Sequence, residues 1–246
     1  MDATTVIALC VLFALSAALY SSVGHGGASA YIAAMALFGI APEVMKPTAL
    51  ALNLLVAGFG TWRYARSGLT NWRLVAAFAL TATPAAFIGG GIHLAAIYYK
   101  PLVGLLLWAA AARLLWQPKA LAERETHSPT LWVTLPAGAA LGLLAGLTGT
   151  GGGIFLSPLI ILNAWEEPRH TSGVVAAFIL LNSIAGLAGN VASVGHLPVQ
   201  LPLFLAAVAA GALLGTWLGV ERLPRPWLLR TLGVVLVVAG AKLLFT

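Results

Sequence analysis

A long apolar tract near the start of the chain is interrupted by Gly24-His25-Gly26-Gly27-Ala28-Ser29, and a later one by Gly149-Thr150-Gly151-Gly152-Gly153-Ile154. The two stretches begin 125 positions apart. Each glycine inside a helix costs roughly 1 kcal/mol relative to alanine. Two such clusters at matching places therefore predict that a helix ends at each and that a second one begins just after it.

The composition is that of a polytopic membrane protein. Of the 246 residues, 60% are hydrophobic and only 8% are charged, whereas a soluble domain carries about 25% charged residues. The net charge of +6 then reflects basic loops between membrane segments rather than a nucleic-acid partner. The single cysteine, Cys10, excludes an internal disulfide, and no His, Cys, Asp and Glu residues have metal-ligand spacing. We therefore expect no metal, no cofactor and no catalytic residues.

Ten apolar tracts follow one another, and the second tract of each half is short. At about 1.5 Å per residue, the tract 28–40 reaches about 20 Å, which is less than a hydrocarbon core of about 30 Å. The tracts lie at 5–22, 28–40, 47–64, 72–92 and 101–116, and then at 131–147, 154–164, 171–191, 202–218 and 227–245.

The second half repeats the first at a constant offset of 125 positions. The most informative matches are Gly24/Gly149, Gly26/Gly151, Gly27/Gly152 and Pro101/Pro226. Self-similarity at a fixed offset is the sign of repeated structural units. We therefore predict an N-terminal membrane repeat at 1–117, a cytoplasmic connector at 118–129 and a C-terminal membrane repeat at 130–246.

The basic residues predict that the two repeats are inverted. Since basic loops favour the cytoplasm, equivalent loops with opposite charge lie on opposite faces of the membrane. Inversion needs an odd number of crossings per half. It is met if all five tracts cross, or if the first two form a hairpin that enters and leaves by one face, which gives about eight to ten membrane segments in total. Fusing those two tracts into one broken span gives parallel repeats and is disfavoured. The decisive residues are Arg63, Arg66 and Arg73 after the third tract, Lys100 after the fourth, and Arg222, Arg225 and Arg230 after the ninth, while 192–201 carries no Lys or Arg.

Paired helix starts favour an anion. The first N–H groups of a helix lack intrahelical partners, and two helix N-termini together contribute roughly one positive charge. Inverted repeats with interrupted helices are typical of transporters whose substrate lies near the membrane midplane. Close packing between helices through small residues is the alternative reading.

A few side chains are candidates to complete this site. His25 lies within the first cluster and would donate to the anion or carry its proton, although a structural histidine is the alternative. Polar residues in the third tract of each half would shape the pocket or bond between helices. Glu43 is expected at the interface, with proton coupling as the alternative. The candidate binding residues are Gly24, His25, Gly26, Gly27, Ala28, Ser29, Asn53, Gly149, Thr150, Gly151, Gly152, Gly153, Asn182 and Ser183.

These motifs resemble those of the sulfite exporter TauE/SafE family, also called the 4-toluene sulfonate uptake permease family. The duplicated glycine motif carries the resemblance together with two further stretches, the basic loop Tyr64-Ala65-Arg66-Ser67-Gly68 and the segment from Phe178 to Gly186. The similarity extends from about Leu12 to Leu244. It implies transport of sulfite, sulfonates or related sulfur-containing anions across the bacterial inner membrane, often outward.

The first hypothesis is therefore a multi-pass secondary transporter, and the family resemblance implies export. An inside-negative potential drives anion export without coupling, whereas uptake would need protons or sodium. An anion or small-solute channel built from paired half-helices is the alternative. An intramembrane serine–histidine enzyme is disfavoured because Ser29 and His25 lie in no nucleophile motif. The lipid bilayer is the expected surrounding, and homo-oligomerisation stays open.

Overall fold

The computed structural model describes residues 1–22, 24–115, 125–221 and 226–245, and all its regular elements are helices. Most of the connector predicted at 118–129 lies outside these residues, as do Arg222 and Arg225. In chain order the elements are α1 (Ala3–Ser21), α2 (Ala28–Leu37), α3 (Pro42–Arg66), α4 (Trp72–Gly91), α5 (Ala96–Leu115), α6 (Leu131–Thr148), α7 (Gly153–Leu162), α8 (Pro168–Gly189), the 3-10 helix η2 (Val191–His196), α9 (Leu201–Glu221) and α10 (Pro226–Phe245).

Among the residues that the structure describes, five helices are long and apolar enough to cross a membrane: α1, α3, α4, α6 and α8. Large apolar side chains such as Leu80, Ile97 and Trp132 are exposed on the outside of the bundle, where lipid would cover them. The prediction of an all-α polytopic membrane protein is therefore confirmed.

Glycines allow the outer helices to pack backbone to backbone. A Cβ atom on Gly211 or Gly215 of α9 would collide with the carbonyl oxygens of Ala14 and Ala18 in α1. The α4–α6 pair uses the same contact, since Gly142 lies against the carbonyl of Ala82. Small residues at such interfaces bring helices close enough for dispersion contacts between their backbones, which is how helices associate in lipid.

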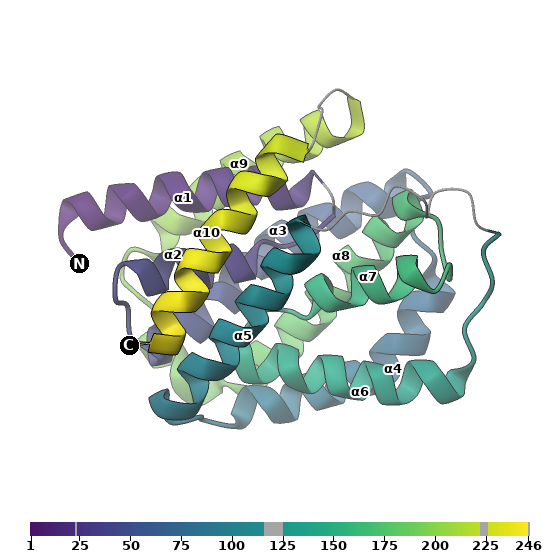
Figure 1. Ribbon diagram of the computed structural model, residues 1–246, viewed down its shortest axis with the longest axis horizontal. Helices are drawn as coiled ribbons and strands as arrows, with labels where there is room; N and C mark the ends of the chain where they lie inside the picture. The colour runs from purple at the N-terminus through teal and green to yellow at the C-terminus, as the bar shows by residue number, and fades with distance from the viewer. Residues whose placement is uncertain (23, 116–124, 222–225, 246) are drawn as a thin grey trace.

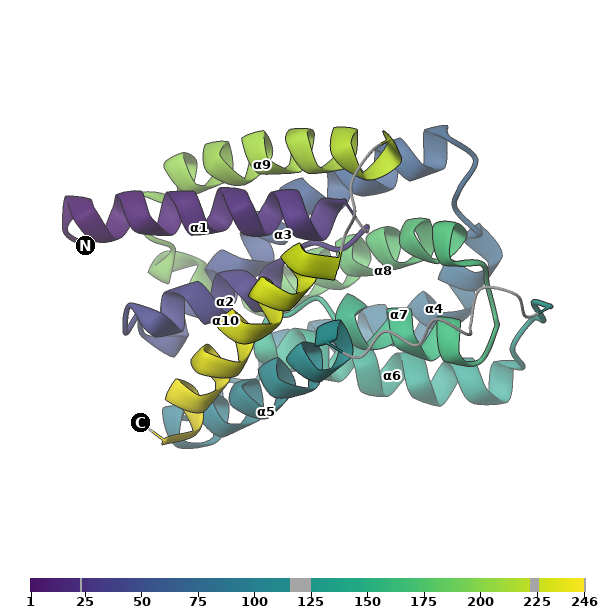
Figure 2. The ribbon, with the colours of Figure 1, turned by 45° about the horizontal axis from the view of Figure 1, so that its top comes forward.

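The centre of the molecule is formed by α3 and α8, which pack against each other. The two short helices begin near this centre and run apart, α2 toward the end of the molecule that carries both chain termini and α7 toward the opposite end (Figures 1 and 2). The basic loop after α3 is predicted to face the cytoplasm, so the end of the molecule that holds it is called the inner end below and the termini-bearing end the outer end.

Two helices begin earlier than the apolar tracts predict. Helix α3 starts at Pro42 rather than Pro47, and α8 starts at Pro168 rather than Thr171. Proline fits the first helical turn because it has no N–H to leave unpaired, so it sets the start even where charged residues follow. As a result Glu43 and Lys46 belong to α3. Trp165, just before α8, is buried against Phe78.

Candidate functional site

Each glycine motif turns the chain between two antiparallel helices. In the first motif Gly24 and Gly27 have φ of 78° and 93°, and Gly27 is the N-cap of α2. In the second motif Gly149, Gly151 and Gly152 have φ of 80°, 74° and 76°, and Gly152 is the N-cap of α7. A side chain in this left-handed region costs roughly 1–2 kcal/mol, which explains glycine at these positions.

Both short helices begin with N–H groups that precede the first intrahelical bond. In α2 the bonds start with Ala30 and Tyr31, whose N–H groups both donate to the Gly27 carbonyl. In α7 they start with Phe155 and Leu156, which donate to Gly152. The N–H groups just before these, together with the positive end of each helix dipole, form a favourable environment for an anion.

The structure brings the two motifs to one side chain, Asn53 of α3. A Cβ atom on Gly26 would lie 2.5 Å from Asn53 Oδ1, and one on Gly151 would lie 2.8 Å from Asn53 Nδ2. Ile179 of α8 contacts both positions, and Ser183 Oγ lies 3.4 Å from the same point on Gly151. The side chains in these contacts are uncharged, so the positive potential here comes from the backbone.

Three polar side chains of the central helices α3 and α8 are buried without partners in the described structure. Asn53, Asn182 and Ser183 are each 0% exposed. Neither amide of the two asparagines nor the Ser183 hydroxyl has a hydrogen-bond partner within the described part of the chain. Each unpaired buried polar group costs about 1–3 kcal/mol of folding free energy. A ligand that forms hydrogen bonds to these groups would recover that cost as binding free energy.

The hydroxyls of the motifs are tied locally, and His25 lies at the edge. Ser29 Oγ and Tyr20 OH share a hydrogen bond of 2.9 Å, as do Thr150 Oγ1 and Thr148 Oγ1. His25 is half-buried with its ring edge-on to that of Tyr20, 6.3 Å between centroids. Of the predicted residues, Gly26, Gly151, Asn53 and Ser183 are therefore the ones brought together, with His25 and the hydroxyls beside them. Glu43 is exposed in the first turn of α3 and takes no part in these contacts.

Each motif also packs on the helix of the other half. Gly24 lies against the backbone of Ser172 in α8, and Gly149 lies against Lys46 in α3. Both contacts fall in the first two turns of the central helices. A shift of either central helix would therefore also displace the motif that packs against it.

Sequence reasoning missed the tyrosines that brace the motifs. Tyr31 OH donates to the Gly26 carbonyl at 2.9 Å, and Tyr99 OH donates to the Thr148 carbonyl at 3.0 Å. Both tyrosines are buried. Tyr31 was recognisable as the one aromatic residue of α2. Tyr99 carried no such signal, because its partner is far away in the sequence.

Lys46 was missed as well, because it precedes the predicted start of its tract. Its side chain is only 6% exposed. Its ammonium donates to the carbonyls of Gly89, Gly90 and Ile92 at 3.2, 2.8 and 3.1 Å. These carbonyls are at the C-terminal end of α4, where a cation complements the helix dipole.

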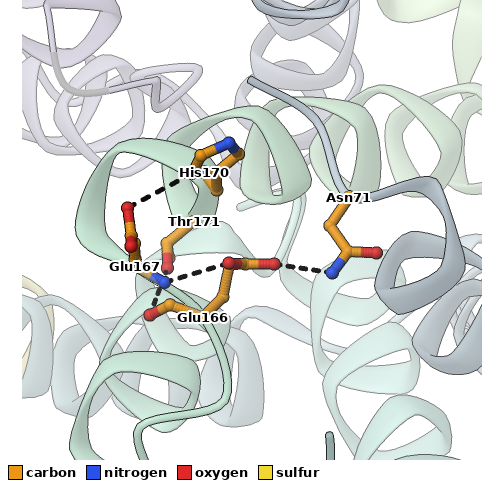
Figure 3. A network of polar contacts seen from close by, with 5 residues as sticks. All are labelled: Asn71, Glu166, Glu167, His170 and Thr171. Atoms are coloured by element: carbon orange, nitrogen blue, oxygen red, sulfur yellow. Dashed lines mark hydrogen bonds and ion pairs between the residues drawn. The ribbon is translucent and has the colours of Figure 1, made fainter. Parts of the chain in front are cut away.

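A polar network joins two connections at the inner end (Figure 3). Asn71, which precedes α4, accepts a bond from Leu74 N–H and donates to Glu166 Oε2 at 2.6 Å. Glu166 lies between α7 and α8 and also accepts from the Glu167 N–H at 3.1 Å. The α3–α4 and α7–α8 connections are thereby held together. Among the described residues no three His, Cys, Asp or Glu side chains gather as a metal site would require.

Comparison with known proteins agrees with the motif analysis. The model of the family "Sulfite exporter TauE/SafE" matches residues 8–243, which confirms the predicted resemblance. The chain is 42% identical to "Probable membrane transporter protein y4hK" of Sinorhizobium fredii (strain NBRC 101917 / NGR234), over 98% of this chain and 99% of that one. It is 27% identical to "Probable membrane transporter protein YjnA" of Bacillus subtilis (strain 168), over 92% and 95%. No solved structure gives a significant match.

Proposed function

This chain belongs to the sulfite exporter TauE/SafE family of membrane transporters, and we propose that it is a secondary transporter of a small sulfur-containing anion such as sulfite or an organosulfonate. It is a multi-pass membrane transporter rather than an enzyme. The inner membrane of a bacterium is the proposed location and export the proposed direction, since an inside-negative potential drives an anion outward.

The observation that carries the proposal is the Asn53 amide between the two motifs. Its Oδ1 faces Gly26, its Nδ2 faces Gly151, and both atoms are buried without a partner among the described residues. An anion accepts from Nδ2, from the Ser183 hydroxyl and from the first N–H groups of α2 and α7. Glycine at both positions allows it to approach the backbone closely.

Burial of the site supports a carrier over an open channel. Asn53 and Ser183 are 0% exposed, so an anion reaches them only after helices have moved. Alternating exposure of one buried site to the two faces is how carriers with internal repeats work.

An inverted arrangement of two repeats is part of the proposal, with the halves at 1–117 and 130–246. Helices α1 and α6 run in opposite directions (Figure 2). The contacts between the halves are also symmetric. Helix α1 packs on α9 of the other half, and its equivalent α6 packs on α4, which is the equivalent of α9. Helix α5 packs on its own equivalent, α10. These relations support a two-fold axis through the crossing of α3 and α8. The first two helices of each half form a hairpin that enters and leaves by one face.

His25 is proposed to assist the anion at the edge of the first motif. It is the one ionisable side chain within either motif, and its equivalent in the second motif is Thr150. If uptake rather than export occurs, His25 or Glu43 would carry the accompanying proton.

Flux in proteoliposomes tests the proposal. Purified protein is reconstituted, and the movement of sulfite and of an alkyl sulfonate is followed in the wild type, Asn53→Leu, His25→Ala and the control Asn163→Ala. Asn163 is an exposed asparagine at the inner end of α7. We expect the wild type to show saturable flux of at least one anion. Asn53→Leu should lower this flux about tenfold or more, since 1.4 kcal/mol of lost binding free energy is tenfold. His25→Ala should lower it less, and the control should leave it unchanged. Wild-type flux of neither anion would reject the substrate class, and full activity of Asn53→Leu would reject the site.

A further inference from the structure

A cavity whose wall combines apolar residues with a few polar ones lies at the outer end, away from Asn53. Its volume is about 80 Å³, enough for several water molecules or one small oxyanion. It is lined by the start of α3, the end of α4, the start of α5, the end of α6 and the end of α8. Its buried wall includes Lys46, Tyr99 and Asn190, whereas Glu43 and His93 stand exposed at its mouth.

Asn190 gives this cavity an unused pair of polar atoms. It is the C-cap of α8, and its backbone N–H is already bonded to the Gly186 and Leu187 carbonyls. The side chain is 1% exposed, and neither Nδ2 nor Oδ1 finds a partner in the portion of the chain that the structure describes. An amide buried in this way costs about 1–3 kcal/mol unless something in the cavity bonds to it.

Lys46 gives the cavity a positive charge. Its three ammonium protons are directed to the carbonyls that end α4, so it contributes charge rather than free donors. Charge at the buried wall is screened much less than charge at the exposed mouth. The field of Lys46 therefore outweighs that of Glu43 for a ligand seated deep in the cavity. Asn190 Nδ2 supplies N–H donors for the same ligand.

The cavity borders the second glycine motif. Leu147 forms part of its wall, Tyr99 in the same wall holds the Thr148 carbonyl, and Gly149 packs on Lys46. At the opposite end of the molecule the Asn71–Glu166 contact joins the connections that flank the site. The cavity therefore lies directly beside the second glycine motif.

We propose that this cavity is an outer anion-binding subsite, in which Asn190 and the charge of Lys46 hold a small oxyanion as it passes between the central site and the outer face. This rests on the proposed function, because it assigns the subsite to the same class of anion. It adds a second binding position, so one molecule of protein holds up to two anions.

Calorimetric titration of the purified full chain with sulfite separates the two sites. The variants are Asn53→Leu, Asn190→Leu and the double variant, which form a cycle. Asn190→Leu removes only atoms that lack partners in the described structure, so it should fold. We expect Asn53→Leu to remove the central site and leave binding that Asn190→Leu weakens about tenfold or more. Lys46→Gln should weaken the same component, whereas Lys242→Gln should not. Lys242 is the matched control, since it donates to the Leu37 carbonyl at the same end of the molecule.

The outcomes distinguish the two proposals. Wild-type binding that disappears entirely in Asn53→Leu and is unchanged in Asn190→Leu overturns the outer subsite and leaves the central one standing. Binding that is unaffected by Asn53→Leu but lost in Asn190→Leu overturns the central site and leaves the outer subsite standing. Absence of any sulfite binding to the wild type overturns both.

Discussion

Replacing Gly151 by alanine places a methyl group in the space between the two motifs. The new Cβ would lie 2.8 Å from Asn53 Nδ2 and 2.9 Å from Ile179 Cγ2, well inside the usual contact distance of about 3.5 Å. Two costs follow. The left-handed backbone at φ 74° costs roughly 1–2 kcal/mol with a side chain, and the crowding costs about 1–3 kcal/mol more. Because the crowding falls where the anion would bind, it should weaken sulfite binding about ten- to a hundredfold, at 1.4 kcal/mol per factor of ten.

Gly39→Ala is the matched control for this variant. Gly39 has φ 70°, and a Cβ there would meet nothing within 4 Å, so it carries the backbone cost without the crowding. Thermal unfolding in detergent should show both variants destabilised, Gly151→Ala the more so. The two variants should differ in sulfite titration and flux. Gly39→Ala should bind and transport sulfite as the wild type does, whereas Gly151→Ala should bind and transport it more weakly. If Gly151→Ala matches Gly39→Ala in sulfite affinity and flux, the space between the motifs is not the binding site.

Three other predictions follow from the same contacts. Asn53→Leu should leave the anion-free protein as stable as the wild type or up to about 3 kcal/mol more stable, since it removes an unpaired buried amide; strong destabilisation in a thermal melt would mean that Asn53 has a structural partner. Tyr99→Phe removes the bond that braces the second motif and should cost about 1 kcal/mol in the same melt, whereas an unchanged melting temperature would show that the bond adds no stability. In a Cys10→Ser background, a membrane-impermeant maleimide added to intact cells should label Gly195→Cys at the outer end but reach Ser67→Cys only after permeabilisation, and labelling of both from one side would refute the inverted topology.

The membrane class and the family were predictable from the sequence because they depend on local features. Runs of apolar residues of bilayer length leave few alternatives to membrane helices, and the paired glycine motifs are short, contiguous stretches. Asn53 was recognisable too, as a lone amide in an apolar tract. That its two polar atoms face Gly26 and Gly151 required the structure, since this depends on how α3 crosses between helices distant in the sequence.

The outer cavity was hidden for a related reason. Lys46 sits beside Glu43 and two prolines, which reads as a polar connection, yet Pro42 starts α3 early and carries Lys46 into the protein. Its partners, the carbonyls that end α4, are backbone atoms and leave no trace in residue identity. Asn190 lies at the end of an apolar tract and reads as an ordinary helix cap, so its burial in a cavity wall appears only once α8 is placed against α4.

The central claim is that a small sulfur oxyanion binds between the two glycine motifs at Asn53. A crystal structure with selenite, a heavier analogue of sulfite with a strong anomalous signal, tests it most directly. We predict an anomalous peak between Gly26 and Gly151, within hydrogen-bonding distance of Asn53 Nδ2 and of the first N–H groups of α2 or α7. A peak elsewhere with none at Asn53, in a crystal of protein that transports sulfite, would contradict the account.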